Sequence, residues 1–183
     1  MATFALNTYG EDPCLQFQLK GEHSGAEAEK ELEIRMHKAI SVIQFKVEGE
    51  TIKRNPSFHL EKRNLLHLID YETGKITLDG KEYELLDHYF PTIDPKDPYA
   101  LTEEEEDIME RLACAFLNCE KLQKHMRFLL NKGSLYKVYN NNLLYHGCVP
   151  LCEDGSLKTV RIYGHEYKGK SLYEMLELSL IHI

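Results

Sequence analysis

Residues 139–150 of the chain read Tyr-Asn-Asn-Asn-Leu-Leu-Tyr-His-Gly-Cys-Val-Pro. The asparagines predict a tight turn, and the apolar residues after them predict a short buried strand that ends at His146. Gly147 has no side chain, so the backbone beside the imidazole can be approached closely. A neutral imidazole suits manganese, iron or zinc. We interpret His146 as a candidate metal ligand, the alternative being a half-buried histidine bonded to a neighbouring carbonyl.

Turn signals on either side of this stretch predict three β-hairpins, over residues 75–85, 135–145 and 159–167. Asp79-Gly80 is a strong two-residue turn signal in the first hairpin. The second turns at the asparagines, and the third turns at Tyr163-Gly164-His165. His146 therefore follows the second strand of the central hairpin.

Helical periodicity predicts helices over residues 27–47, 60–70 and 103–131, and a short one that starts at Ser171. Gly49 is expected to end the first helix, and Gly133 to end the third. Thr102 and Glu105 have the spacing of a capping box, in which each side chain bonds the backbone N–H of the other residue. This cap explains the acidic run Glu103–Glu106 without a metal.

The composition is that of a water-soluble globular protein, with 43% apolar and 28% charged residues among 183. A net charge of −8 argues against nucleic acid as a partner. No signal peptide is visible, and no apolar run approaches the roughly 18 residues of a membrane span. Five cysteines fit free thiols in a reducing compartment, so we expect a cytoplasmic protein that binds no membrane.

Other candidate sites are weaker than His146. Cys148 and Cys152 lack a second pair at zinc-site spacing. Ser134 has no general base near it in the sequence, and no phosphate-binding glycine motif or G-x-S-x-G motif is present. Five other histidines are interpreted as solvated or as structurally satisfied: His23, His37, His67, His125 and His165.

Several segments together resemble one family. They are residues 2–5, 94–106, 116–118, 120–124, 143–150 and 153–156, within a resemblance that covers residues 1–177. They are similar to the class 3 fructose-1,6-bisphosphatases of bacteria, which belong to the calcineurin-like metallophosphoesterase superfamily. The string from Asp94 to Glu106 makes the resemblance specific.

The resemblance implies a phosphoric monoester hydrolase of gluconeogenesis. It would remove the 1-phosphate of fructose 1,6-bisphosphate, giving fructose 6-phosphate, at a dinuclear Mn²⁺ site. His146 matches the strand-end histidine that binds metal in this superfamily. The Asp-x-His, Gly-Asp-x-x-Asp and Gly-Asn-His motifs that supply other ligands are absent from this chain. We therefore expect an internal piece of a longer enzyme, inactive alone, with the remaining ligands beyond its ends.

The expected fold class is α+β: a helical insertion plus part of a metallophosphoesterase-type α/β sandwich, left incomplete. Residues 1–24 and 132–177 would belong to the catalytic domain, and residues 25–131 would form the insertion with one hairpin. Residues 178–183 resemble a translated sequencing adapter, so we expect a non-native tail and exclude His182 from any site. Two alternatives remain open: a non-catalytic helical cap or interaction module, and a relative of the phosphoprotein phosphatases.

Overall fold

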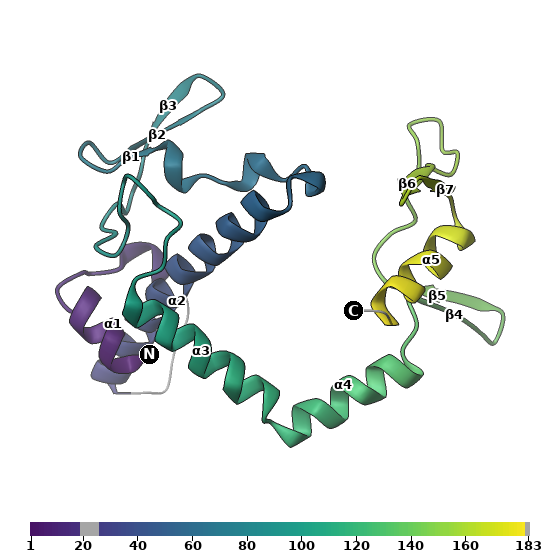
Figure 1. Ribbon diagram of the computed structural model, residues 1–183, viewed down its shortest axis with the longest axis horizontal. Coiled ribbons are helices and arrows are strands. Elements are labelled where there is room, and N and C mark those ends of the chain that lie inside the picture. The colour runs from purple at the N-terminus through teal and green to yellow at the C-terminus, as the bar shows by residue number, and fades with distance from the viewer. Residues whose placement is uncertain (19–25, 182–183) are drawn as a thin grey trace. The chain divides into compact units, whose positions relative to one another are not determined.

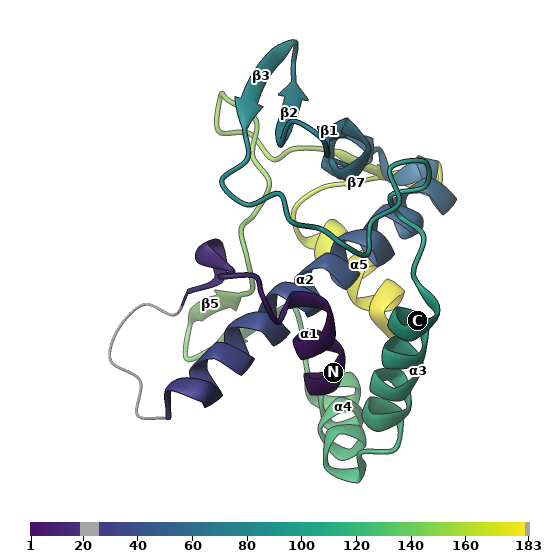
Figure 2. The same cartoon turned by 90° about the vertical axis from the view of Figure 1, so that its left-hand side faces the viewer.

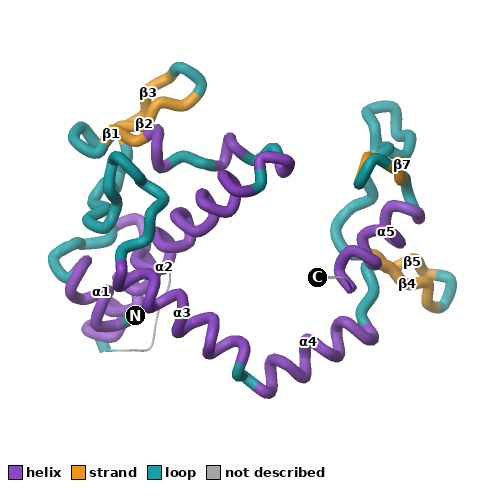
Figure 3. Tube along the Cα trace, in the orientation of Figure 1, coloured by secondary structure: helices purple, strands orange, loops and turns teal. Residues whose placement is uncertain are grey.

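The computed structural model of the chain describes residues 1–18 and 26–181 (Figure 1). The predictions for His23 and His182 lie outside these residues. Helices and small antiparallel sheets are mixed along the chain, which confirms the α+β class (Figure 3). The chain divides into two compact units, Met1–Ala113 and Cys114–Ile183. The expected division at residues 24 and 131 separates a catalytic domain from an insertion, and it stays a prediction.

The first unit is built on one long helix. Helix α1 (Ala2–Tyr9) packs against α2 (Glu27–Arg54), as Figures 1 and 2 both show. Four single 3₁₀ turns, a three-stranded antiparallel sheet and the start of helix α3 (Glu103–Leu117) complete the unit. The turns are Leu15–Phe17, Pro56–Phe58, Glu61–Arg63 and Leu66–Leu68, and the strands are β1 (Ile69–Asp70), β2 (Lys75–Leu78) and β3 (Lys81–Glu84).

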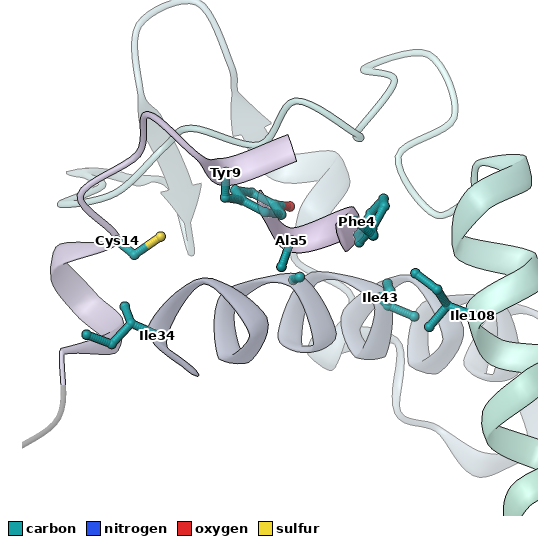
Figure 4. Close-up of a cluster of buried hydrophobic side chains, with 8 residues drawn as sticks. Phe4, Ala5, Tyr9, Cys14, Ile34, Ile43 and Ile108 are labelled. Carbon is teal, nitrogen blue, oxygen red and sulfur yellow. The ribbon is translucent and has the colours of Figure 1, made fainter. Parts of the chain in front are cut away.

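Two apolar clusters form the core of this unit. In the larger one, Ala5 and Tyr9 of α1 face α2, and Ile43 of α2 meets Ile108 of α3 (Figure 4). The smaller cluster consists of Val42, Leu66, Ile93 and Tyr99. Val42 and Ile43 are adjacent on α2 and belong to different clusters, so the helix is buried along two stripes. Full burial of a side chain such as Ile43 stabilises the fold by about 1.5–3 kcal/mol.

A buried ion pair joins α2 to α3. The Lys46 Nζ donates to Glu105 Oε2 at 2.7 Å and to the Thr92 carbonyl at 2.6 Å, and both charged side chains are removed from water. Glu105 Oε2 also accepts the Thr102 N–H at 2.9 Å, while Thr102 Oγ1 accepts the Glu105 N–H at 3.3 Å. The predicted capping box is confirmed, but it does not fully explain the acidic run, because Glu105 also neutralises Lys46.

A second buried lysine on α2 binds carboxylates from two other segments of the unit. Lys38 is fully buried and forms ion pairs with Asp12 and, at 2.6 Å, with Asp87. Its Nζ also lies 5.4–5.6 Å from the centroids of three aromatic rings, those of Tyr9, Tyr89 and Phe90.

The pKa of Asp12 reflects this arrangement. Burial alone would raise it, yet hydrogen bonds from Lys38 and from the Cys14 backbone N–H outweigh burial and lower it below the usual 3.8. A depressed carboxyl pKa stabilises the fold above the unfolded-state pKa. This contribution is therefore lost as the pH falls below about 4.

Gly49 does not end α2, contrary to the prediction, because the helix continues to Arg54. The glycine is explained by packing: a Cβ at this position would overlap Cδ1 and Cε1 of Tyr99. The Tyr99 ring is buried against the helix, its hydroxyl lies 2.8 Å from His67 Nδ1, and the Lys53 Nζ is 4.4 Å from the ring centroid.

The predicted helix over residues 60–70 is also wrong. The segment forms two 3₁₀ turns and then strand β1, which pairs Ile69 with Ile76 of β2. The buried side chain of Leu66 points into the smaller apolar cluster, and the Tyr71 hydroxyl donates to its carbonyl at 2.7 Å. Strand pairing and this packing outweigh the helix propensity of the leucines.

The second unit contains helices α4 (Glu120–Lys132) and α5 (Lys170–Ile181) and two separate hairpins. The hairpins are β4–β5 (Tyr136–Tyr139 and Asn142–Tyr145) and β6–β7 (Val160–Ile162 and His165–Tyr167). The β4–β5 hairpin turns at the asparagines, as predicted, with positive φ angles of 48° and 61° at Asn140 and Asn141. The predicted hairpins are thus confirmed, including β2–β3.

The single helix predicted over residues 103–131 is instead two helices. The Asn118 side chain donates to the Cys114 carbonyl at 2.8 Å, and Cys119 is extended at φ −79° and ψ 99°. Asparagine competes in this way with helical hydrogen bonding, so α3 ends and α4 begins anew. Gly133 follows α4, as predicted, and α5 runs on to Ile181, beyond the one or two turns expected.

Among the described residues, no helix has both the length and the apolar character that a membrane crossing requires.

Replacing Gly49 by alanine tests the packing against Tyr99. Helix propensity alone would make Gly49→Ala stabilising by about 1 kcal/mol. We expect destabilisation by about 1–3 kcal/mol instead, because the added methyl group overpacks the site. Urea denaturation measures the change, and Gln44→Ala, at an exposed position of the same helix, should stay within about 0.5 kcal/mol. An increase in stability for Gly49→Ala would contradict the role given to Tyr99.

Removing one partner of the Lys46–Glu105 pair tests its importance. Lys46→Met leaves a buried carboxylate unpaired and should cost about 3–5 kcal/mol in urea denaturation at neutral pH. Combining it with Glu105→Gln should recover part of the loss, since a glutamine keeps the capping geometry without a charge. Lys75→Met, which removes an exposed cross-strand pair with Glu82, is the matched control and should cost about 1 kcal/mol or less. Equal effects of the two methionine variants would refute the interpretation.

Candidate functional site

His146 directly follows strand β5 and is exposed, with Gly147 next to it at a φ of +79°. The prediction of a buried strand is wrong, since all four residues of β5 are exposed. The physical reason is that β5 pairs only with β4, in a two-stranded sheet, within the part of the chain that the structure describes. The imidazole is therefore accessible, and the positive φ at Gly147 is one that other residues rarely adopt.

The backbone of His146 is tied to helix α5 through one intermediate residue. Its N–H donates to the Leu135 carbonyl at 2.9 Å, and the Leu135 N–H donates to Glu177 Oε1 at 2.8 Å. The Ser134 hydroxyl bonds the same carboxylate oxygen. These hydrogen bonds lower the pKa of Glu177, that from Ser134 contributing most, so the carboxylate keeps its charge and its hold on the hairpin.

A second contact from α5 holds the chain after His146. The Tyr173 hydroxyl donates to the Cys148 carbonyl at 3.1 Å. Its ring is buried and meets Tyr136 edge to face, with 6.0 Å between centroids. Helix α5 therefore holds Leu135, which accepts the His146 N–H, and Cys148, two residues after His146, and it leaves the imidazole exposed.

An apolar groove of about 420 Å³ lies on the same hairpin. Cross-strand pairing places Tyr136 opposite Tyr145 and Val138 opposite Leu143, and these four side chains line one wall. Tyr173 of α5 and Leu157 line another part of it. Val138 and Leu143 are more than half exposed, so this groove offers an uncovered apolar surface immediately beside His146.

The described residues of this chain do not gather into a metal centre. Across residues 1–18 and 26–181, no three histidine, cysteine, aspartate or glutamate side chains gather at a distance suited to one ion. A lone imidazole does not fit the donor set of a dinuclear manganese site. No reaction step at a metal can therefore be built from these residues alone.

The other candidate site residues are exposed or take part in structural contacts. Cys148 and Cys152 are free and exposed thiols. The Ser134 hydroxyl bonds Glu177 and the Tyr136 carbonyl, which makes it part of the α5 anchor. His37 stacks edge to face on Phe17 with 5.4 Å between ring centroids, and His125 and His165 are exposed.

Sequence reasoning found His146 but missed Glu177 and Tyr173. Their contacts span 42 residues to Leu135 and 25 residues to Cys148. No local sequence pattern predicts these two contacts, because they depend on where α5 packs. The acidic and aromatic residues of that helix, Glu177 and Tyr173, were the available signal.

Comparison with known proteins assigns the chain to a protein family. A family model described as Firmicute fructose-1,6-bisphosphatase matches residues 1–182, and the chain belongs to this family. No solved structure matches it.

Three curated relatives of the chain carry a more specific name than the family model. The chain is 52% identical over 180 residues to fructose-1,6-bisphosphatase class 3 of Clostridium acetobutylicum. The proteins of the same name from Clostridioides difficile and Listeria innocua are 53% identical over 178 residues and 49% identical over 180 residues. Each alignment covers 97% of this chain but only 27–28% of the relative. The resemblance to class 3 is confirmed, and the chain spans little more than a quarter of the length of these relatives.

Breaking the α5 anchor should loosen the backbone at His146. In Glu177→Ala, the Leu135 N–H loses its acceptor, and the hydrogen bond from His146 to Leu135 should open more often. We expect its amide hydrogen to exchange roughly three- to tenfold faster, measured by NMR. Glu174→Ala is the control, since Glu174 makes an exposed pair with Lys170 at 3.0 Å on the same helix. If both variants leave the exchange rate unchanged, Glu177 is not the anchor.

Proposed function

We propose that this chain is a segment of a cytoplasmic fructose-1,6-bisphosphatase of class 3. The enzyme would hydrolyse the 1-phosphate of fructose 1,6-bisphosphate to give fructose 6-phosphate and phosphate, as a step of gluconeogenesis. The observation that carries this proposal is the identity of about half of all residues with proteins of that name, along nearly the whole chain. The substrate is accordingly a sugar bisphosphate.

His146 is proposed to contribute one imidazole to a manganese site. Its exposure, the neighbouring Gly147 and the anchoring of Leu135 and Cys148 by α5 support this role. Anchoring of the backbone matters because a ligand held in place loses little freedom when it binds metal. The described residues supply no complete donor set, so the other ligands would come from parts of the enzyme outside this chain.

The two hairpins of the second unit are proposed to join a metallophosphoesterase-type sandwich in the whole enzyme. Both are two-stranded, and an isolated two-stranded sheet is at best marginally stable in water. The apolar face of β4–β5 and its groove would then pack against strands from the rest of the enzyme. Residues 25–131 would form an insertion beside this catalytic part.

The test uses the full-length enzyme that contains this segment. We expect His146→Ala to lower the release of phosphate from fructose 1,6-bisphosphate, with Mn²⁺ present, by at least about 100-fold, because a ligand is lost. His125→Ala removes an exposed histidine of α4 and should keep full activity.

The 183-residue chain alone should release no more phosphate than its own His146→Ala form. Full activity of the substituted full-length enzyme would remove His146 from the metal site. Absence of activity in the unsubstituted full-length enzyme would refute the proposed reaction itself.

A further inference from the structure

A cavity of about 500 Å³ lies in the Met1–Ala113 unit, far along the sequence from His146. Its inner lining is apolar: Leu66, Ile76 and Tyr99 are buried there, and Phe45 and Leu65 are partly exposed. The volume lies within the range of small-molecule sites, which are mostly apolar with a few polar groups. The cavity is therefore large enough for a compact organic molecule.

The wall formed by Tyr99 is fixed before any ligand arrives. The ring packs against α2 at Gly49, where no side chain intervenes, and its hydroxyl lies 2.8 Å from His67 Nδ1. The buried amide of Asn64, also in the lining, donates to the Gly49 carbonyl at 3.4 Å. A site whose walls are already held in place loses less entropy on binding than a flexible one.

The charged residues of the lining carry a net positive charge. They are Lys62, Arg63 and Glu48, and Arg63 pairs with Glu48 at 2.5 Å. No carboxylate of the described residues lies within ion-pair distance of the Lys62 ammonium. A positive opening is notable in a chain whose net charge is −8. It favours an anionic group on the ligand.

We propose that this cavity binds a small organic anion with an apolar body. The apolar part occupies the space over Leu66, Ile76 and Tyr99, and a carboxylate or phosphate group lies near Lys62. A sugar bisphosphate does not fit this description, since it has no apolar body to replace water on these side chains. The site is therefore additional to the proposed reaction and does not rest on it.

The test compares two probes that share a phenylalkyl body and differ in charge, 4-phenylbutyrate and 4-phenylbutylamine. Each is titrated into the full 183-residue chain, and methyl NMR signals of leucine, isoleucine and valine are followed. For probes of this size we expect a Kd of order 1 mM for the carboxylate. The shifts should centre on Leu65, Leu66 and Ile76, and the amine should bind about fivefold more weakly.

Charge reversal provides the decisive variant. Lys62→Glu, at an exposed position, should weaken the carboxylate about fivefold and strengthen the amine. Lys121→Glu makes the same change of net charge on exposed α4 and should leave both affinities unaltered. Leu65→Gln, at a side chain 40% exposed, should weaken both probes without unfolding the chain.

Three results would each overturn the proposal. The amine could bind as tightly as the carboxylate, Lys62→Glu could leave the preference unchanged, or the shifts could centre on Val138 and Leu143 of the other unit. The last outcome would assign the binding to the apolar groove beside His146.

Discussion

Two lysines on one helix organise the Met1–Ala113 unit. Lys38 and Lys46 are removed from water, and an unpaired ammonium in that position would cost several kcal/mol. Each must meet carboxylates, and these come from distant parts of the chain: Asp12, Asp87 and Glu105. The start of the chain, the segment after the β2–β3 hairpin and the first turn of α3 are therefore all drawn to α2. The apolar clusters then fill the space that these contacts define.

The features that could be predicted from sequence are those governed by a few adjacent residues. Asp79-Gly80 and Asn140-Asn141 have positive φ angles that favour two-residue turns, so both hairpins followed from the sequence. The Thr102 capping box could also be predicted, because it involves only two residues three positions apart. The burial of Lys38 and Lys46 was not, because helical periodicity assigns lysines to the solvent side. The prediction that Gly49 ends the helix was wrong because the glycine is required by packing against the Tyr99 ring. That ring lies 50 residues further along the chain, where no local pattern connects it to Gly49.

The candidate site divides in the same way. His146 was recognisable from the residues next to it, since a strand, a histidine and a glycine follow one another. Its exposure was not, because that depends on how many strands pair with β5. Glu177 and Tyr173 hold the backbone near the histidine, at Leu135 and Cys148, from a helix that begins 24 residues after His146. The exposed apolar side chains of the β4–β5 hairpin agree with a segment that covers about a quarter of its relatives.

The contact between Gly49 and Tyr99 has a consequence for how this family can diverge. Any side chain larger than hydrogen at position 49 occupies the space of the ring at position 99, so position 49 cannot change freely while the ring stays. A homologue that lost the aromatic ring could accept alanine in the helix and gain helix propensity. One that kept the ring would have to keep the glycine. The two positions should therefore vary together over evolution, as a correlated pair visible in an alignment of the family.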